Sequence, residues 1–174
     1  MQDERDRLIA CIPRLRRYAR ALIGNRTGAD DLVQDTLERG WKKLSSWQRG
    51  SDMRAWLFGI MHNLHIDQVR RPEMATEALD DDMPMPAAPH TDSLEMRDLQ
   101  SALAALPAEQ REILLLVALE EMSYEEVATT LGVPVGTVMS RLSRARQKLR
   151  AQMEGRSVVS PLVSPAVSPL KVVK

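Results

Sequence analysis

The chain has 174 residues, which suits one or two small domains, and its 24 basic and 24 acidic side chains give a formal net charge of zero. Only 3% of the residues are aromatic and helix formers are plentiful, so the composition predicts an all-α protein. The single cysteine excludes an internal disulfide, and no apolar run reaches the roughly 18 residues of a transmembrane span. The N-terminus lacks an apolar signal core, so we expect a cytoplasmic protein.

The neutral total conceals a strong segregation of charge along the chain. Residues 1–71 hold 14 basic against 9 acidic side chains, and residues 122–150 hold 5 against 2. Between these blocks, residues 72–93 hold 6 acidic side chains and no basic one. Two basic blocks separated by an acidic one are typical of two modules that face nucleic acid, with a different task for the segment between them.

The first basic block has the apolar periodicity of a helical bundle. Its first helix ends at Gly24, and Pro13 indicates that this helix either kinks or begins there. Thr27 and Asp30 are the predicted cap of the second helix. The predicted buried stripe of that helix consists of Val33, Leu37, Trp41 and Leu44. A loop then begins at Trp47, and Asp52 is the predicted cap of a third helix over about 53–70.

Two stretches of this block carry more polar groups than packing requires. Asp30, Asp31, Gln34 and Asp35 cluster in the first turns of the second helix. The helix dipole accounts for one or two acidic residues there, whereas the full cluster suits a basic protein partner. The segment 54–71 combines aromatic side chains, an amide and flanking arginines, as surfaces that bind single-stranded nucleic acid do.

The second basic block contains the signature of a helix-turn-helix. Pro107 opens a helix that supplies most of the core of this block. Ser123 and Glu126 form a capping box, Gly132 ends that short helix, and Pro134 suits the first turn of the next. The apolar stripe of the last helix leaves a face of hydroxyl and basic groups that can bind phosphates and base edges. This face comprises Thr137, Ser140, Arg141, Ser143, Arg144 and Lys148.

Two further segments have compositions that disfavour folding on their own. Residues 72–92 combine acidic side chains with four prolines, which predicts a flexible linker. This linker either follows a basic channel of a partner or is a solvated spacer. From Val159 to Leu170 the motif Val-Ser-Pro-x repeats three times, and proline at every fourth position excludes a helix. The predicted organisation is therefore a domain over 1–71, a linker over 72–92, a helix-turn-helix domain over 93–152 and a disordered tail over 153–174.

Three motifs in this order give the chain a resemblance to bacterial sigma factors of the extracytoplasmic-function (ECF) group. DDLVQDTL resembles the polymerase-binding helix of that family, and WLFGIMHNLHIDQVRR resembles its −10 reading helix. LPAEQREILLLVALEEMSYEEVATTLGVPVGTVMSRLSRARQKLR resembles its −35 reading domain. The likeness covers about residues 5–71 and 92–150. It implies an all-α fold of two small helical domains, the second ending in a helix-turn-helix.

The resemblance also implies a role for each surface. Core RNA polymerase would be bound, at the clamp coiled coil of its largest subunit, through Asp30, Asp31, Leu32, Val33, Gln34 and Asp35. Asn63 would hold an unstacked base of the −10 strand, the loop from Trp47 would complete its pocket, and Arg70 and Arg71 would contact phosphates. The −35 duplex would be read through Ser140, Arg141, Ser143 and Arg144. Met139 stands where many family members have a basic residue, so we expect an altered −35 preference.

The family's promoter elements lie about one and a half DNA turns apart, or roughly 50 Å at about 35 Å per turn, which the linker is long enough to span. An anti-sigma factor is a natural further partner. Two alternative functions remain. The chain could be a sigma mimic that titrates an anti-sigma factor without binding DNA, or a dimeric helix-turn-helix repressor.

The sequence contains no nucleophile motif and no phosphate-binding loop, so we expect neither an enzyme nor a cofactor. His62 and His65 lie three residues apart without an evident third ligand, so we expect no metal site.

Overall fold

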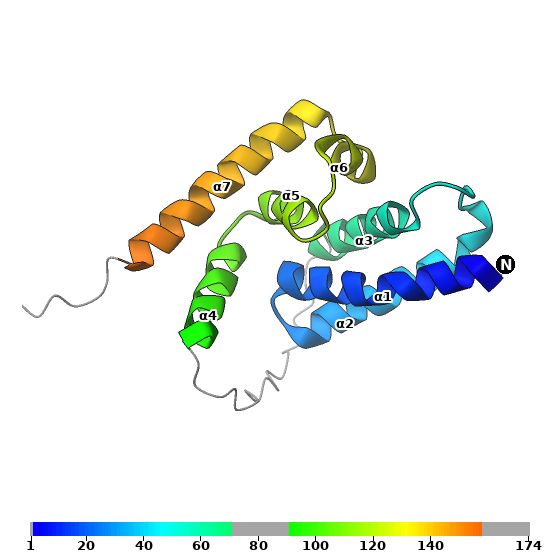
Figure 1. Ribbon diagram of the computed structural model, residues 1–174, viewed down its shortest axis with the longest axis horizontal. Coiled ribbons are helices and arrows are strands. Elements are labelled where there is room, and N and C mark those ends of the chain that lie inside the picture. Colours follow the sequence, from blue (N-terminus) through cyan, green and yellow to red (C-terminus); the bar gives the residue numbers. More distant parts are fainter. Residues whose placement is uncertain (1, 71–90, 158–174) are drawn as a thin grey trace, which may run out of the picture.

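The computed structural model describes residues 2–70 and 91–157, and within these ranges every regular element is helical (Figure 1). The first three α-helices are α1 (Gln2–Ile23), α2 (Arg26–Lys42) and α3 (Met53–Arg70), with a short 3₁₀ helix, η1 (Leu44–Ser46), after α2. The other four are α4 (Thr91–Ala104), α5 (Ala108–Ala118), α6 (Tyr124–Leu131) and α7 (Val135–Ser157). The predicted all-α class is confirmed.

Helices α1, α2 and α3 form a bundle that buries one side of each helix. Helix α1 begins at Gln2 and runs through Pro13, so of the two predicted alternatives, a kink or a start at Pro13, the start is excluded. Its end is as predicted, because Gly24 adopts a φ of +85° and donates its N–H to the carbonyl oxygen of Arg20 at 3.0 Å. The edge-on contact of Tyr18 with Phe58, with ring centroids 4.9 Å apart, joins α1 to α3.

Two predictions for α2 need correction. Its cap is Asn25 rather than Thr27, because the Asn25 side chain accepts the N–H of Gly28 at 2.7 Å. Trp41 is not buried: its ring is 49% exposed and lies 4.8 Å from the guanidinium carbon of Arg5. The buried stripe consists of Ala29, Leu32, Val33, Thr36 and Gly40. Gly40 belongs to this stripe because its lack of a side chain allows the Leu57 side chain of α3 to approach closely.

Helices α4 to α7 form the second unit, and its helix-turn-helix is confirmed. Ser123 accepts the N–H of Glu126 at 3.2 Å, and the Glu126 carboxylate accepts the N–H of Ser123 at 2.7 Å. Gly132 ends α6 with a φ of +65°, and Val138 on α7 is buried as its stripe predicts. Helix α7 continues to Ser157, past the predicted boundary at 152.

Because the capping box satisfies two helix N-terminal donors, Ser123→Ala should lower the free energy of unfolding by about 1 kcal/mol. Chemical unfolding in urea, followed by circular dichroism, measures this change. Ser101→Ala is the matched control, since the Ser101 hydroxyl bonds only the carbonyl oxygen of Arg97 within α4. A control as destabilised as Ser123→Ala would show that the cap has no special role.

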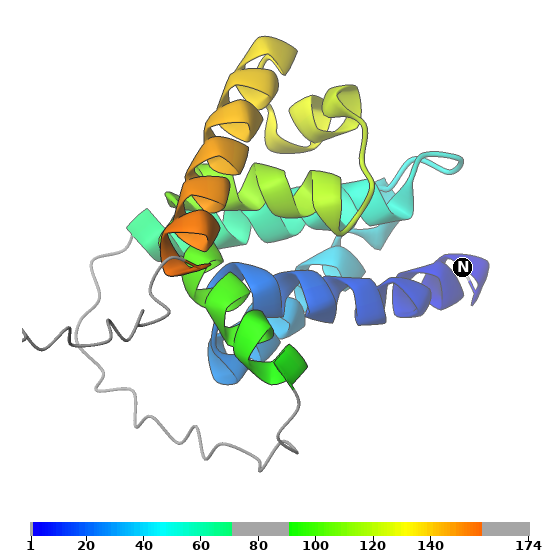
Figure 2. The same cartoon turned by 60° about the vertical axis from the view of Figure 1, so that its left-hand side comes forward.

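The two units pack directly against each other, which the sequence did not predict. Helix α5 lies against α1 and helix α6 against α3, so the second unit covers one side of the bundle (Figure 2). Their buried apolar side chains belong to one contiguous cluster. Helix α4 starts at Thr91, slightly before the predicted end of the linker. The remaining linker residues, and the tail from residue 158 on, lie outside the described ranges.

Candidate functional site

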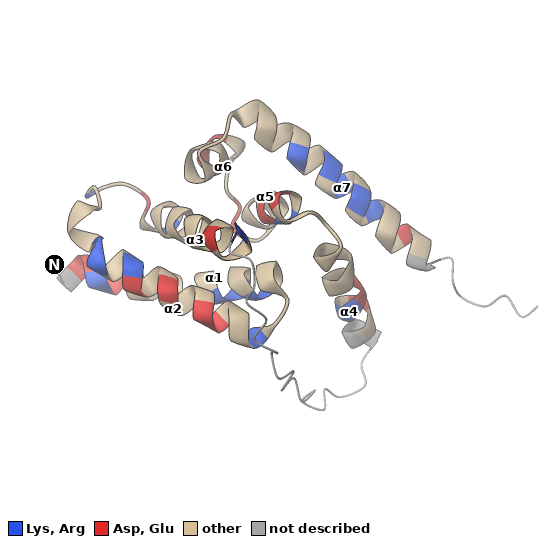
Figure 3. Ribbon diagram, turned by 180° about the vertical axis from the view of Figure 1, so that it is seen from behind, with Lys and Arg blue, Asp and Glu red and all other residues tan. Residues whose placement is uncertain are grey.

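The predicted polymerase-binding segment divides into an exposed and a buried part. Asp31, Gln34 and Asp35 are exposed on α2, which carries a row of acidic positions along its outer side (Figure 3). Leu32 and Val33 are buried, so the structure gives them a packing role beneath this surface. Asp30 is half-buried, with a carboxylate oxygen 3.9 Å from Arg20 and another 3.8 Å from Arg26. We call Asp31, Gln34 and Asp35 the acidic face.

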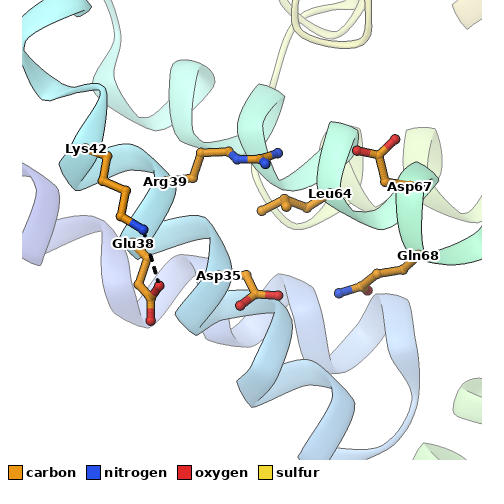
Figure 4. Close-up of a pocket in the computed structure, with 7 residues that line it drawn as sticks. All are labelled: Asp35, Glu38, Arg39, Lys42, Leu64, Asp67 and Gln68. Atoms are coloured by element: carbon orange, nitrogen blue, oxygen red, sulfur yellow. Dashed lines mark ion pairs between the residues drawn. The ribbon is translucent and has the colours of Figure 1, made fainter.

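A groove of about 420 Å³ between α2 and α3 borders the acidic face (Figure 4). Asp35, Glu38, Arg39 and Lys42 line it from α2, whereas Leu64, Asp67 and Gln68 line it from α3. The Lys42 ammonium lies 3.9 Å from the Glu38 carboxylate. This mixture of donors and acceptors suits a polar partner. The groove could not be predicted from the sequence, because its two walls come from different helices that are separated along the chain.

The residues predicted to read the −10 strand occupy different environments. Asn63 and Arg70 are exposed on α3, whereas Arg71 lies outside the described ranges. Trp47 is only 7% exposed, and its indole N–H is buried without a hydrogen-bond partner in the structure. The exposed part of its loop is 48–51, where Arg49 donates to Glu4 at 2.6 Å. The structure therefore places Trp47 in the core and presents its loop neighbours and Asn63 at the surface.

The predicted −35 face lies along α7 as a row of basic positions (Figure 3). Ser140, Ser143, Arg144 and Lys148 are exposed, and Thr137 is half-buried. Arg141 is also half-buried, because its guanidinium lies 2.8 Å from the Glu109 carboxylate of α5. Met139 stands 53% exposed among these residues, so this basic face carries a thioether that cannot form an ion pair.

A cluster of arginines around Glu120 joins the two units, and sequence reasoning missed it. Glu120 is fully buried in the turn between α5 and α6. Its carboxylate lies 2.9 Å from Arg17 and 3.6 Å from Arg14 of α1. Arg54 of α3 donates to the Glu120 backbone carbonyl oxygen at 2.6 Å. No sequence signal identifies this role, since an acidic residue in a turn is ordinarily exposed.

A second set of polar contacts crosses the same boundary. The Nδ1 atom of His62 lies 2.7 Å from the Glu112 carboxylate, and Arg111 donates to the carbonyl oxygen of Leu22 at 2.7 Å. Burial lowers the pKa of His65, so its imidazole is neutral at pH 7. His62 and His65 do not share a ligand set, and no group of three metal-binding side chains occurs in the described part of the chain.

The close packing brings residues assigned to different DNA elements together. Arg70 of α3 and Arg141 of α7 line the same cavity of about 320 Å³, together with His62, His65 and Glu109. At the centre of this contact, a Cβ atom placed on Gly59 would lie 3.4 Å from the carbonyl oxygen of Thr130. Helix α3 and the helix-turn-helix therefore touch in this structure. Within the ranges described, no helix is long and apolar enough to cross a bilayer.

Comparison with known proteins places both units in families. Residues 8–62 match the model described as the Sigma2 domain of PhyR, and residues 96–149 match Sigma-70, region 4. The ECF RNA polymerase sigma factor EcfG of Rhodopseudomonas palustris is 42% identical over 150 residues, which cover 84% of this chain and 83% of that protein.

Two solved structures have the same arrangement of helices. The sigma factor RpoE of Bartonella quintana, in complex with the anti-sigma factor NepR, is 36% identical with a TM-score of 0.74, covering 88% of this chain and 98% of that one. The anti-anti-sigma factor PhyR of the same organism, also complexed with NepR, is 20% identical with a TM-score of 0.59. That match covers 85% of this chain and 49% of PhyR, and it shows the fold alone. On the strength of the EcfG match and the two family models, the chain belongs to the ECF family of RNA polymerase sigma factors.

Proposed function

We propose that this chain directs core RNA polymerase to promoters by using three separate surfaces. The acidic face on α2 binds the polymerase, α3 captures the −10 strand, and α7 reads the −35 duplex. The observation that carries the proposal is the presence of all three surfaces, each solvent-accessible at its central residues, on one chain of this family. The protein acts by binding rather than by catalysis, and it acts in the cytoplasm, where the polymerase is.

The acidic face supports the first of these contacts. Asp31 and Asp35 are four residues apart and therefore lie one above the other on α2. Gln34 adds amide donors and acceptors between them. Carboxylates presented in this way form charge-assisted hydrogen bonds with Arg and Lys side chains, so the partner surface is basic. The buried Leu32 and Val33 keep α2 fixed on the bundle and thereby position the face.

Asn63 and its surroundings support capture of a single strand. Its exposed side chain carries both an amide N–H and a carbonyl oxygen, the groups needed to bond a base edge. Unstacking a base costs a few kcal/mol, which hydrogen bonds of this kind can offset. Arg70, the exposed last residue of α3, supplies a cation for the phosphate backbone.

Arg144 is exposed on the basic face of α7, so Arg144→Ala should selectively weaken promoters that depend on a −35 element. Loss of one good guanidinium contact to DNA costs about 1–3 kcal/mol, or roughly 5- to 150-fold in affinity. Abortive transcription on paired promoters with and without that element measures the effect. Gln147→Ala, at a neighbouring exposed position of α7, is the control. Equal loss on both promoters would contradict the assignment.

We also propose that an anti-sigma factor binds this chain. A groove of about 710 Å³ between α1 and helices α4 and α5 has an apolar floor that includes Leu99, Leu103 and Leu115. Arg16 and Arg20 lie on its rim. This combination of apolar floor and basic rim fits an amphipathic helix with acidic flanks. RpoE, solved with NepR bound, supports an anti-sigma factor as the occupant.

The match of residues 8–62 to the model described as the Sigma2 domain of PhyR favours a second candidate function, titration of an anti-sigma factor without transcription. Transcription in vitro separates the two candidates. The purified chain and core polymerase are incubated with a genomic promoter library, and transcript ends are mapped. New start sites with shared upstream elements support an initiation factor. Binding to core without transcripts supports the mimic. A symmetric DNA footprint without polymerase would instead support a repressor.

A further inference from the structure

The packing of the two units conflicts with simultaneous use of both promoter elements. Arg70 and Arg141 line one cavity of about 320 Å³, although they are assigned to elements roughly 50 Å apart. Helix α6 packs against α3, so closely that a Cβ atom on Gly59 would lie 3.4 Å from the Thr130 carbonyl oxygen. Relative movement of the units is therefore needed before α3 and α7 can contact one promoter together.

The contacts that oppose this movement centre on Glu120. Its carboxylate is fully buried between Arg14 and Arg17, which belong to the other unit. Arg17 also donates to the backbone carbonyl oxygen of Leu119, and Arg54 donates to that of Glu120. A buried carboxylate is tolerated only while such partners surround it, so the turn is held against α1 and α3 as long as the units stay packed.

The same contacts are suited to being broken reversibly. The side chains of Arg14 and Arg17 are about half exposed, at 53% and 55%, so water already hydrates much of them. When the units separate, the Glu120 carboxylate also regains hydration, which offsets the lost ion pairs. The ion pairs of Glu120 therefore favour the packed state, and the two units can still separate reversibly.

We propose that Glu120 and its arginine partners are a built-in latch that holds the free chain in a closed, promoter-incompetent state. The latch is a property of this chain alone and needs no bound protein. Its consequence for promoter use rests on the proposed function. Core polymerase and promoter DNA then bind the open state, and their apparent affinity is reduced by the fraction of chain that is closed.

Distance measurement on the full chain tests the latch. Spin labels are attached to Ser45→Cys and Gln147→Cys, both at exposed positions and one in each unit, in a Cys11→Ala background. The otherwise unchanged chain should give one narrow distance distribution. Glu120→Gln should raise the ratio of open to closed molecules by at least about tenfold, because the ion pairs are lost. Glu121→Gln is the matched control, since Glu121 is the adjacent and exposed carboxylate.

Arg17→Gln tests the same contact from α1, at a position whose substitution leaves the core of the second unit intact. Circular dichroism confirms that each variant is folded. The double variant that combines Glu120→Gln with Arg17→Gln should be no more open than Glu120→Gln alone, because each substitution removes the same ion pair. A broad distance distribution in the unchanged chain, or no shift in either variant, would overturn the latch. An equal shift with Glu121→Gln would overturn it too.

Transcription gives the functional readout. If most molecules of the unchanged chain are closed, Glu120→Gln should lower the concentration of chain needed for half-maximal transcription by about tenfold. This is the same factor by which it raises the ratio of open to closed molecules. Transcripts without any such shift would overturn the latch and leave the proposed function standing. Absence of transcripts from every variant would count against the proposed function, while the distances still decide whether the latch exists.

Discussion

Reversal of both charges on the acidic face, by Asp31→Lys with Asp35→Lys, is expected to weaken binding to core RNA polymerase by at least about a hundredfold. The two carboxylates lie one turn apart on α2 and are exposed, so the partner's basic groups would face two ammonium groups instead. Like charges placed in contact cost several kcal/mol, and every 1.4 kcal/mol is about tenfold in affinity. Fluorescence anisotropy of the labelled chain titrated with core polymerase measures the change.

The control must carry the same change in net charge. Glu95→Lys with Glu154→Lys meets this requirement, because both residues are exposed and both lie on the second unit. It should bind core within about threefold of the unchanged chain, since exposed charges away from an interface contribute little. Similar losses in both double variants would mean that net charge, rather than the acidic face, governs binding.

The second large effect is on stability, where Ile113→Ala is expected to lower the free energy of unfolding by about 2–5 kcal/mol. Ile113 is fully buried on α5, the helix that packs against α1, α6 and α7. Truncation leaves a cavity that these helices fill only in part. The loss is large against the roughly 5–15 kcal/mol by which domains are stable. Thermal and urea unfolding, each followed by circular dichroism, measure it.

Two further substitutions serve as comparisons for Ile113→Ala. Ile113→Val removes one methylene and should cost about 0.5–1.5 kcal/mol. Leu94→Ala on α4 should change stability by less than about 0.5 kcal/mol, because Leu94 is 65% exposed. If truncation at Ile113 were as mild as truncation at Leu94, the assignment of α5 to the centre of the second unit would be wrong.

Local signals explain why the helix-turn-helix was predicted well. The Ser123–Glu126 capping box, the left-handed Gly132 and the fixed φ of Pro134 each act within a few residues, so the sequence determines them directly. The third helix was likewise predicted over its observed range, since Asp52 precedes it and its side chain accepts the N–H of Arg54 at 2.9 Å.

Tertiary packing explains where the predictions for the first unit failed. Trp41 fits the periodicity of a buried stripe, yet the small residues of α2 pack more closely against its neighbours and leave Trp41 outside. Helix α1 continues through Pro13, although proline removes one backbone hydrogen bond of the helix, because residues on both sides of Pro13 are buried in the core. These outcomes depend on which helices meet, which apolar spacing within a single helix does not specify.

The surfaces were predictable as sets of residues, whereas their mutual arrangement was not. The exposed acids of α2 and the exposed basic groups of α7 follow from amphipathic patterns. The pairings of Glu120 with Arg17 and of Glu112 with His62 join residues that are 103 and 50 positions apart, respectively, so they depend on long-range packing. Charged residues are ordinarily exposed, so nothing in the sequence marks these as contacts.

The most direct test of this account is DNA cleavage by an iron chelate tethered to α3 or to α7 in the complex with core polymerase and promoter. The chelate is attached at Gln68→Cys or at Gln147→Cys, close to the predicted −10 and −35 contacts, in the Cys11→Ala background. The account predicts two cleavage clusters about one and a half DNA turns apart, with the α7 cluster upstream and in duplex DNA. Coincident clusters, or cleavage that does not require core polymerase, would contradict it.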